Sequence, residues 1–316
     1  MGRNIIIGTR GSKLALWQAE WVKSEIEKRN PGTGVTLERI KTTGDKITDV
    51  PLAQVGGKGL FVKEIEEALL DGRIDLAVHS MKDVPTALPE GLHLRAITER
   101  EDPRDAVLSR TGVFLKDLPK GAKIGTSSLR RQAQILHMRP DFEIIQLRGN
   151  VDTRIRKLDE GHFDAIILAG AGVKRLGWEG RVTEYLSPEV SLPAIGQGAL
   201  GIETRVDDEY INNVAAFFDH PGTSTAVRAE RALLKRLEGG CQVPIAAYGE
   251  LTEGGGLRLT GLVASTDGKT LVKDVLCGTA ADAESMGRKL AEMLLKEGAW
   301  EILKDLYDVK APDPAG

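Results

Sequence analysis

The feature that most constrains the fold of this chain is a short motif that occurs twice. Residues 7–12 have the sequence IGTRGS, and residues 124–129 have the sequence IGTSSL. Each motif closes an apolar run typical of a strand and opens a run typical of a helix. A second pair of similar segments, residues 72–75 (GRID) and 161–164 (GHFD), leads into further apolar runs. The repetition predicts two α/β lobes in tandem, each with a partly parallel sheet.

From Pro221 the pattern changes. A helix to Leu237 is followed by strand-like runs at residues 245–251, 257–263 and 270–276, and then by helical runs from residue 280. Strands followed by helices are typical of a small α+β domain. The predicted domains are domain 1 at residues 1–99 with a returning segment at 200–217, domain 2 at 100–199, and domain 3 at 218–316.

Two segments of the first lobe differ in regularity. Residues 14–29 predict an amphipathic helix whose apolar side includes Leu14, Trp17, Trp21 and Val22. Residues 42–59 show no periodicity and hold four glycines, so we expect a long loop there. A loop of this length in a compact domain is usually functional or mobile, and a passive surface connection is the alternative.

Composition and charge exclude several classes of protein. A length of 316 residues allows two or three domains, and a net charge of −3 argues against general nucleic-acid binding. Two cysteines make no disulfide framework, which favours a reducing cytoplasm. No apolar run reaches the roughly 18 residues that a membrane span needs. We therefore expect a soluble cytoplasmic protein.

Hydroxyl side chains stand at the helix starts of both repeated motifs. They are Ser12 in the first lobe, and Thr126 and Ser128 in the second. Backbone N–H groups and the helix dipole make such a position an anion site, although a hydroxyl there is also an ordinary N-cap. Because the two positions match between the lobes, they indicate a cleft that holds an acidic ligand.

The second lobe is rich in arginine at the ends of its predicted elements. Residues 123–175 hold ten basic and six acidic residues, a local charge of +4. Adjacent Arg130 and Arg131 oppose the dipole at a helix start, so we expect an anionic partner to compensate them. Arginine binds carboxylate or phosphate bidentately. The other candidates are Arg148, Arg154 and Arg175, with Arg10 in the first lobe.

Lys82 and Asp83 follow the predicted strand at residues 74–79. In open α/β sheets, ligands bind beyond the carboxyl ends of the strands, which is where this pair falls. A surface ion pair of little energetic value is the alternative.

Cys241 lies in residues 237–244 (LEGGCQVP), between the end of a helix and a strand. Two glycines before it allow a tight turn that presents the thiol. Most free cysteines are instead buried as small hydrophobes. A thiol close to this many cations would have its thiolate favoured.

The sequence lacks the signatures of several other chemistries. The five histidines are scattered without metal spacing, residues 56–59 (GGKG) do not complete a P-loop, and there is no Gly-x-Ser-x-Gly elbow. Three interpretations remain open: a two-lobed binder of an acidic ligand, a thiol-dependent acyl transferase, or an enzyme that builds a polyanion on a covalent anchor.

From about Ile5 to the last helix, the chain resembles the hydroxymethylbilane synthase (porphobilinogen deaminase) family. The motifs that carry the resemblance are residues 8–12 (GTRGS), 14–18 (LALWQ), 55–61 (VGGKGLF), 77–85 (AVHSMKDVP), 100–105 (REDPRD), 125–131 (GTSSLRR), 147–154 (LRGNVDTR) and 238–241 (EGGC).

The resemblance implies a fold of two periplasmic-binding-protein-like (type II) α/β lobes and a smaller α+β C-terminal domain that carries the cysteine. It implies a monomeric transferase, without metal, that joins four porphobilinogens head to tail with loss of ammonia. The chain would grow on a dipyrromethane cofactor held by Cys241 through a thioether, and water would release hydroxymethylbilane.

The resemblance also implies roles for the candidate residues. Asp83 would be catalytic and would stabilise the positive charge that develops at a pyrrole nitrogen as ammonia leaves. Cofactor binding would fall to Lys82, Asp83, Thr126, Ser128, Arg130 and Arg131. Substrate binding would fall to Arg10, Ser12, Arg148, Arg154 and Arg175. The segment 42–59 would be a mobile loop over the cleft.

Overall fold

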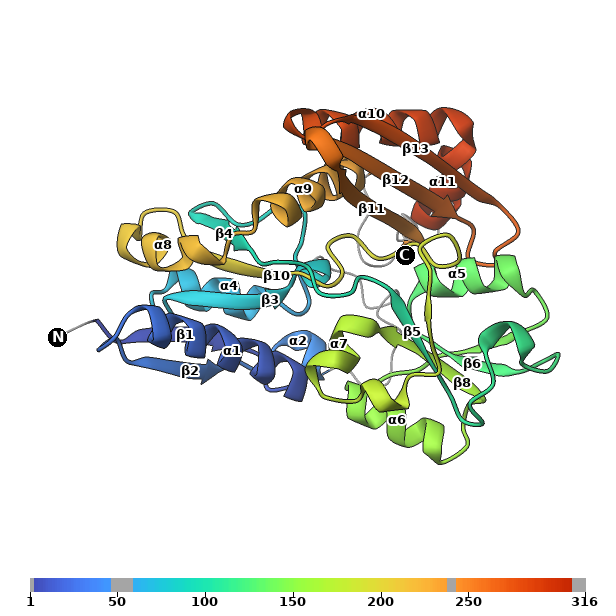
Figure 1. The fold of residues 1–316 in the computed structure, drawn as a ribbon, viewed down its shortest axis with the longest axis horizontal. Coiled ribbons are helices and arrows are strands. Elements are labelled where there is room, and N and C mark those ends of the chain that lie inside the picture. Colours follow the sequence, from blue (N-terminus) through green and yellow to red (C-terminus); the bar gives the residue numbers. More distant parts are fainter. Residues whose placement is uncertain (1–2, 47–58, 238–242, 309–316) are drawn as a thin grey trace, which may run out of the picture.

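The computed structural model describes residues 3–46, 59–237 and 243–308. Figure 1 shows two α/β lobes side by side, coloured blue to cyan and green, with a third unit in orange and red lying above them. Among the described residues, every helix is too short or too polar to span a bilayer.

The first lobe is built on a five-stranded sheet of order β2-β1-β3-β10-β4. Strands β1, β2 and β3 run parallel, and β10 is antiparallel to both of its neighbours. Its strands are β1 Ile5–Thr9, β2 Val35–Arg39, β3 Leu76–Ser80, β4 Leu92–Ile97 and β10 Leu200–Arg205; its helices are α1 Lys13–Arg29, α2 Thr43–Lys46, α4 Lys63–Leu70 and α8 Glu209–Ala215.

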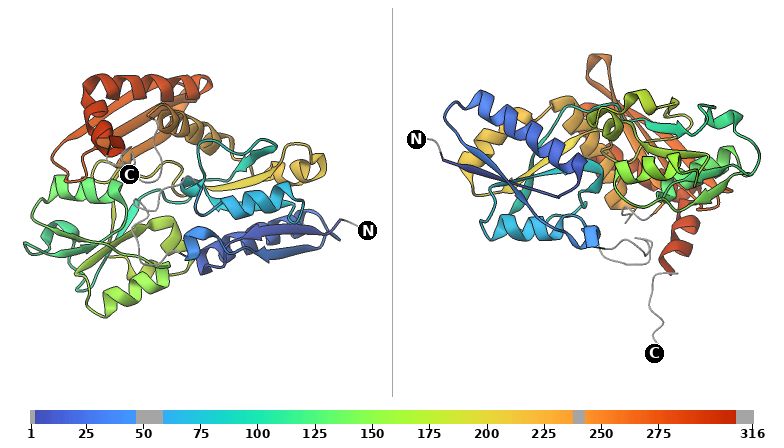
Figure 2. Two further views of the ribbon diagram at one scale, coloured as in Figure 1. Left: turned by 180° about the vertical axis from the view of Figure 1, so that it is seen from behind. Right: turned by 90° about the horizontal axis from the view of Figure 1, so that it is seen from below.

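Side chains along β1 point alternately to the two faces of the sheet, and helices cover both faces. Ile5 and Ile7 pack with α1 and α8 on one face, whereas Ile6 packs with α4 on the other. The view from behind in Figure 2 shows α4 in cyan on that second face. With helices on both faces, the central strands β1, β3 and β10 are mostly buried, whereas the edge strands β2 and β4 are partly exposed.

The second lobe repeats this plan with the order β7-β6-β8-β5-β9. Strands β6, β7 and β8 are parallel, and β5 is antiparallel to β8 and β9. Its strands are β5 Asp105–Ser109, β6 Lys123–Gly125, β7 Glu143–Ile145, β8 Ala165–Ala169 and β9 Glu184–Leu186; its helices are α5 Leu129–Met138, α6 Val151–Asp159 and α7 Gly170–Arg175.

In each lobe the fourth strand is the one that enters directly after the chain crosses between lobes. Strand β5 follows the first crossing and β10 follows the second, and both are antiparallel to the strand before them in the sheet. The repeated motifs occupy the ends of β1 and β6, which hold equivalent positions. The predicted tandem lobes are therefore confirmed.

The third unit is a meander of order β11-β12-β13 with helices packed on one face. Leu233 of α9 and Leu290 and Leu294 of α10 form its core against β12. The other face packs on α5 of the second lobe, where Ala133 meets Leu262. Its elements are α9 Pro221–Arg236, β11 Ile245–Thr252, β12 Gly256–Ala264, β13 Leu271–Thr279, α10 Ala283–Leu294 and α11 Trp300–Asp308.

This arrangement confirms the predicted fold class as two α/β lobes of the same plan with a smaller α+β unit. The exact domain boundaries at residues 99, 199 and 217 stay a prediction.

The expectation for α1 was partly wrong. Trp17 and Trp21 are 39% and 36% exposed, while the buried positions include Ala15, Ala19 and Val22. The reason is helical spacing: positions 15, 19 and 22 share one face, and small side chains there let α1 approach the sheet closely. Trp21 lies at the edge of that face, with its ring 5.7 Å from that of Phe218.

Candidate active site

The first lobe presents its candidate residues at one edge of the sheet. Because β1 and β3 are parallel, their carboxyl ends meet, and the chain continues from them into Arg10 and Ser12 and into Lys82 and Asp83. Asp83 ends a single 3-10 turn, Met81–Asp83, that follows β3 directly. Buried Met81 anchors this turn, since its backbone N–H donates to Ala199 O at 3.0 Å.

The second lobe presents its candidates in the same way. Strand β6 leads into Thr126 and Ser128, β7 leads toward Arg148, and α6 carries Arg154 in its first turn. Strand β8 leads into α7, which ends at Arg175. The candidates of both lobes therefore lie beyond the carboxyl ends of parallel strands, as the sequence predicted for Lys82 and Asp83.

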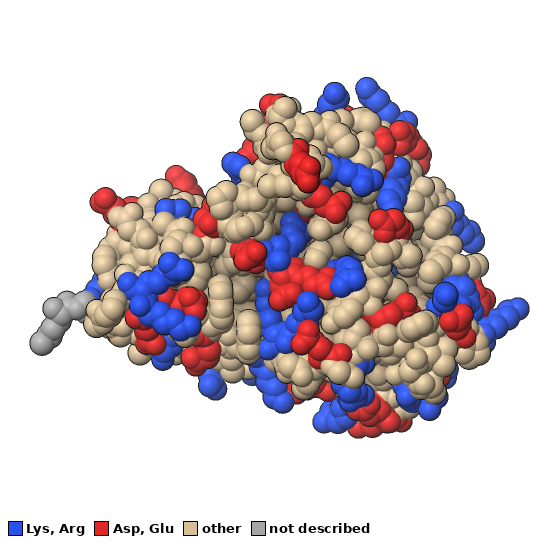
Figure 3. All heavy atoms as spheres, viewed as in Figure 1, with Lys and Arg blue, Asp and Glu red and all other residues tan. Residues whose placement is uncertain are grey.

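The two sets face each other across the lobes. Lys13 at the start of α1 lies 3.4 Å from the Asp152 carboxylate at the start of α6. Asp83 of the first lobe interacts electrostatically with Arg154 of the second. Figure 3 shows that Lys, Arg, Asp and Glu side chains also gather in the middle of one face of the molecule. The contacts of Lys13 with Asp152 and of Asp83 with Arg154 place the candidate residues in a charged region between the lobes, which we call the interlobe cleft.

Desolvation dominates the electrostatics of the cleft. It lowers the pKa of Lys82 to about 8, with Arg131 and Arg130 lowering it further and Asp83 and Asp105 opposing them. It also lowers the pKa of Arg154 to about 10, where Arg131 and Arg148 add to the effect and Asp83 opposes it. Desolvated cations that lie close together are strongly stabilised when an anionic ligand binds between them.

Arg130 and Arg131 have a protein partner that we did not foresee. Both guanidinium groups donate to the buried carboxylate of Asp105, Arg130 Nη1 to Oδ2 at 2.8 Å and Arg131 Nη2 to Oδ1 at 2.8 Å. The expected anionic partner of this pair is therefore supplied by the first residue of β5. Asp105 stands in the quoted segment 100–105, but 25 residues separate it from Arg130, so only the fold brings them together.

The hydroxyl groups divide between capping and other positions. Ser12 is an ordinary N-cap, because its Oγ accepts from Ala15 N at 3.2 Å. Thr126 is buried, and its Oγ1 accepts from Ser128 N at 3.2 Å. Ser128 holds the N-cap position of α5 without a capping hydrogen bond from its side chain. That leaves the Ser128 hydroxyl better placed than Ser12 for a ligand.

The outer arginines are held by neighbours in this structure. Arg10 Nε donates to Asp45 at 3.2 Å, and its guanidinium lies 4.3 Å from the Phe61 ring centroid. Arg175 Nη2 donates to Gly198 O at 2.6 Å, and desolvation lowers the pKa of Arg175 to about 10. Arg154 Nε donates to Gly149 O at 2.7 Å.

A buried glutamine was missed by the sequence reasoning. Gln18 lies within the quoted segment 14–18, and its side-chain amide donates to Ser80 Oγ at 3.0 Å. Through this bond α1 contacts the end of β3, two residues before Lys82. Its signal was a polar residue on the buried face of an amphipathic helix.

Two predicted features lie outside the described residues. They are Cys241 and most of the segment 42–59. Of that segment, Thr43–Lys46 forms the short helix α2.

Two family models together match most of the chain. "Porphobilinogen deaminase, dipyromethane cofactor binding domain" matches residues 5–213, and "Porphobilinogen deaminase, C-terminal domain" matches residues 224–296. The chain belongs to the porphobilinogen deaminase family. The first model covers both lobes and hence the cleft between them.

Curated relatives agree over nearly the full length. Porphobilinogen deaminase of Geotalea uraniireducens is 66% identical over 305 residues, which cover 96% of this chain and 95% of that protein. Porphobilinogen deaminase of Geobacter sulfurreducens is 65% identical over 301 residues, which cover 95% and 94%.

Solved structures similar to the chain include binding proteins. A nutrient binding protein from Burkholderia cenocepacia aligns with a TM-score of 0.43 and 16% identity, over 69% of this chain and 93% of that one. The aliphatic sulphonate binding protein SsuA from Escherichia coli aligns with a TM-score of 0.40 and 15% identity, over 75% and 71%.

Proposed function

We propose that this chain is a hydroxymethylbilane synthase. It condenses four porphobilinogen molecules head to tail, with loss of ammonia, and releases the linear tetrapyrrole by hydrolysis. The observation that carries the proposal is the electrostatic interaction of one carboxylate, Asp83, with the desolvated cations Lys82 and Arg154 between the lobes of a porphobilinogen deaminase family member.

The residues present fit a dipyrromethane cofactor. Each of its two pyrroles carries an acetate and a propionate, so the group needs several cations and few acids around it. Lys82, Arg148 and Arg154 each have a pKa lowered by desolvation, which a bound carboxylate would relieve. Lys82, Thr126, Ser128, Arg130 and Arg131 would hold these carboxylates, and Cys241 would form the thioether.

When bound, dipyrromethane supplies the pyrrole carbon on which the product is extended, and it stays attached through all turnovers. The protein's part is to bind, orient and stabilise charge. The Asp83 carboxylate accepts a hydrogen bond from the pyrrole N–H of porphobilinogen and stabilises the positive charge that develops as ammonia leaves. Where water is excluded and the local dielectric constant is low, this fixed negative charge stabilises the developing positive charge far more strongly than it would in water.

Four arginines and one serine bind the carboxylates of substrate and product. Arg10, Ser12, Arg148, Arg154 and Arg175 bind them, and each added pyrrole brings two more negative charges. Arg10 and Arg175 exchange their present partners, Asp45 and the Gly198 carbonyl, for these carboxylates. Arginine suits the task because its planar fork binds a carboxylate with two hydrogen bonds.

The setting of the enzyme follows from the same proposal. We expect a cytoplasmic monomer that acts on a small molecule, without a metal, a nucleic acid or a membrane. Two cysteines and a net charge of −3 support this setting.

The denatured intact mass of the purified protein, compared with that of a Cys241→Ala variant, tests the covalent cofactor. The expected result is an excess of two porphobilinogen units less two ammonia, present in the unaltered protein and absent from the variant. If both masses are unmodified, porphobilinogen is added and the proteins are weighed again. A gain of the same adduct identifies an apoenzyme, and no gain contradicts the proposal.

An Asp83→Asn variant tests the catalytic assignment separately. It keeps the size of the side chain but removes its charge, so we expect kcat to fall by about 10²-fold or more, with the cofactor mass retained. Asp71→Asn, on an exposed turn of the same lobe, is the matched control and should leave kcat unchanged. Equal activity of the two variants would contradict the role of Asp83.

A further inference from the structure

We propose that a pocket outside the interlobe cleft binds a small polyanion. The pocket lies between α9, α10 and β4, where the third unit meets the first lobe, and has a volume of about 810 Å³. We call it the α9 pocket, because one face of α9 forms its longest wall. Neither the repeated motifs nor the proposed reaction uses it, so the inference does not depend on the proposed function.

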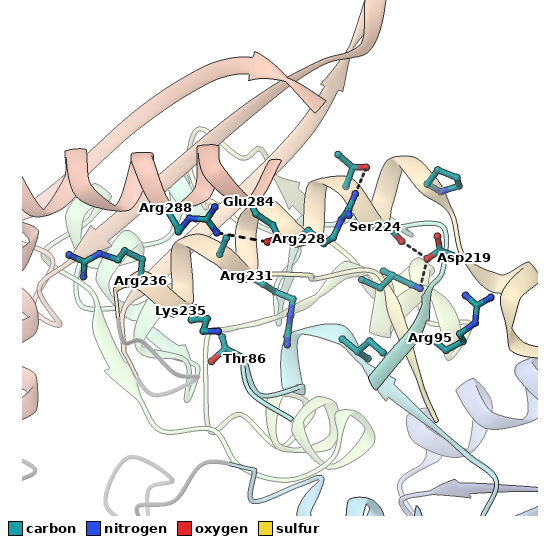
Figure 4. A pocket seen from close by; sticks show the side chains of 15 residues that line it. Thr86, Arg95, Asp219, Ser224, Arg228, Arg231, Lys235, Arg236, Glu284 and Arg288 are labelled. Carbon is teal, nitrogen blue, oxygen red and sulfur yellow. Dashed lines mark hydrogen bonds and ion pairs between the residues drawn. The ribbon is translucent and has the colours of Figure 1, made fainter. Parts of the chain in front are cut away.

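Basic side chains outnumber acidic ones in this pocket by six to two, in a chain that is acidic overall. The basic residues are Arg95 from β4, Arg228, Arg231, Lys235 and Arg236 from α9, and Arg288 from α10. Figure 4 shows Arg231 and Lys235 extending from α9 toward the loop that carries Thr86, whereas Arg236 points away from them.

The two acidic residues do not neutralise this charge. Asp219 accepts hydrogen bonds from Ile97 N at 3.0 Å and from the Ser224 hydroxyl, so it acts as a cap rather than as an ion-pair partner. Glu284 pairs with Arg288 at 3.8 Å, a long contact between exposed side chains that contributes little.

Only part of the positive charge of the pocket is compensated. Arg236 pairs with Glu292 at 2.6 Å. Arg95, Arg228 and Lys235 make no ion pair with any acidic residue in the described part of the chain. Arg228, Arg231 and Lys235 are spaced three and four residues apart, which stacks three like charges on one face of α9. Like charges at this spacing destabilise a helix, and an anion bound between them removes the repulsion.

Arg231 connects the α9 pocket to the segment that follows Asp83. Its Nη1 donates to Val84 O at 3.0 Å and its Nη2 donates to Pro85 O, the two residues directly after Asp83. An anion in the pocket therefore contacts a side chain that fixes the backbone next to Asp83.

The set of donors defines the class of ligand. Guanidinium and ammonium groups bind phosphate or carboxylate oxygens. Because the charges extend along about two turns of α9, the ligand needs at least two anionic groups. A phosphate compound and a polycarboxylate share this chemistry. Pyrophosphate and citrate are the corresponding probes.

The test measures binding of each probe to the holoenzyme by calorimetry at low ionic strength and without divalent cations. The test variant is Arg228→Ala with Lys235→Ala, two exposed side chains whose removal leaves the core intact. We expect its affinity for at least one probe to fall by tenfold or more. The control, Lys116→Ala with Lys120→Ala on the exposed surface of the second lobe, should keep the affinity of the unaltered protein.

Arg154→Ala separates this pocket from the cleft, because Arg154 belongs to the cleft alone. Binding that survives Arg154→Ala and is lost in the double variant supports the proposal. Loss confined to pyrophosphate assigns a phosphate compound as ligand, and loss confined to citrate assigns a polycarboxylate. The proposal is overturned if neither probe binds, if binding disappears only with Arg154→Ala, or if the double variant and its control bind equally.

Discussion

Asp105 shows how much one buried carboxylate can organise. It is fully buried and accepts hydrogen bonds from Arg130, Arg131, Ser191 Oγ at 2.8 Å and Gln197 Nε2 at 3.0 Å. Both guanidinium groups hold the pKa of Asp105 far below its ordinary value, although desolvation opposes them. The orientation of two proposed cofactor-binding arginines thus depends on a residue that need not touch the cofactor.

The Asp105→Asn substitution should be strongly destabilising. It leaves two buried guanidinium groups without a counter-charge, and breaking a buried pair in this way costs about 3–5 kcal/mol. Urea unfolding at pH 7 measures the loss. Asp117→Asn, an exposed change in the same lobe, is the control and should cost less than about 0.5 kcal/mol. A similar free energy of unfolding for both variants would contradict this account.

A second buried cluster lies in the first lobe, away from the cleft. His79 Nε2 lies 2.9 Å from Glu203 Oε2, and Glu66 of α4 interacts with both residues. Within the described ranges, Glu66 Oε1 and Glu203 Oε1 are buried without a hydrogen-bond partner. Desolvation, with the Glu203 charge, raises the pKa of Glu66 from 4.5 to about 7.

This shift predicts a pH-dependent effect of Glu66→Gln. Between pH 4.5 and 7, Glu66 keeps its proton in the folded protein but loses it in the unfolded chain. The free energy of unfolding therefore falls as the pH rises over this range, until folded Glu66 also ionises at about pH 7. The glutamine variant does not ionise, so its free energy of unfolding should rise relative to that of the unaltered protein over this range, by up to about 3 kcal/mol at pH 8. Thermal unfolding at pH 5 and pH 8 measures the difference. The exposed Glu67→Gln should show no such trend, and a pH-independent effect of Glu66→Gln would refute the shift.

At the scale of elements, hydrogen bonds join the two segments in which the chain crosses between the lobes, which we call the first and the second crossing. Glu101 N donates to Gly198 O at 3.3 Å, and Gln197 Nε2 donates to Pro103 O at 2.6 Å. Gly198 has a φ of +96°, and a Cβ on it would lie 2.2 Å from Glu101 O. Glycine is required here by both conformation and contact.

Gly198→Ala and Gly112→Ala separate these two requirements. Gly112 also has a positive φ, of +73°, but a Cβ there would meet nothing within 4 Å. Gly112→Ala should lower the free energy of unfolding only by the backbone strain, about 1–2 kcal/mol. Gly198→Ala should cost clearly more, because one crossing must move away from the other. Urea unfolding of both variants checks the order, and equal losses would show that the contact has no effect.

For the whole molecule, Glu230 of α9 joins all three units. It is fully buried and accepts from Arg100 Nη2 at 2.7 Å, from Gly196 N at 2.7 Å and from Gly249 N at 2.9 Å. These donors belong to the first crossing, the second crossing and β11. A single carboxylate therefore fixes the C-terminal unit relative to both lobes.

Glu230→Gln should loosen this junction. The amide is neutral and leaves the largely buried Arg100 without its carboxylate, so we expect a loss of about 3 kcal/mol. Hydrogen exchange should become faster at the amides of Gly196 and Gly249 while the centre of the first sheet stays protected. Glu250→Gln, an exposed change on β11, is the control. Unchanged exchange at both glycines would contradict the role of Glu230.

The sequence by itself determined the two lobes and the sheet edge at which Lys82 and Asp83 lie. Its repeated motifs predicted the tandem lobes, and strand-end positions placed Lys82, Asp83 and Ser128 at the cleft, because strands and their turns depend on local periodicity. Trp17 and Trp21 were misplaced, since apolar character does not say which helix face meets the sheet.

Only the tertiary structure decided which charges meet. Asp105 meets Arg130, Glu230 meets Arg100, and Arg95 and Arg288 meet the cations of α9 in the pocket, each time from separate elements. Sequence separation carries no information on such pairs, because Coulomb energy depends on distance and burial in the folded state. Those two quantities exist only once the sheets and helices have packed.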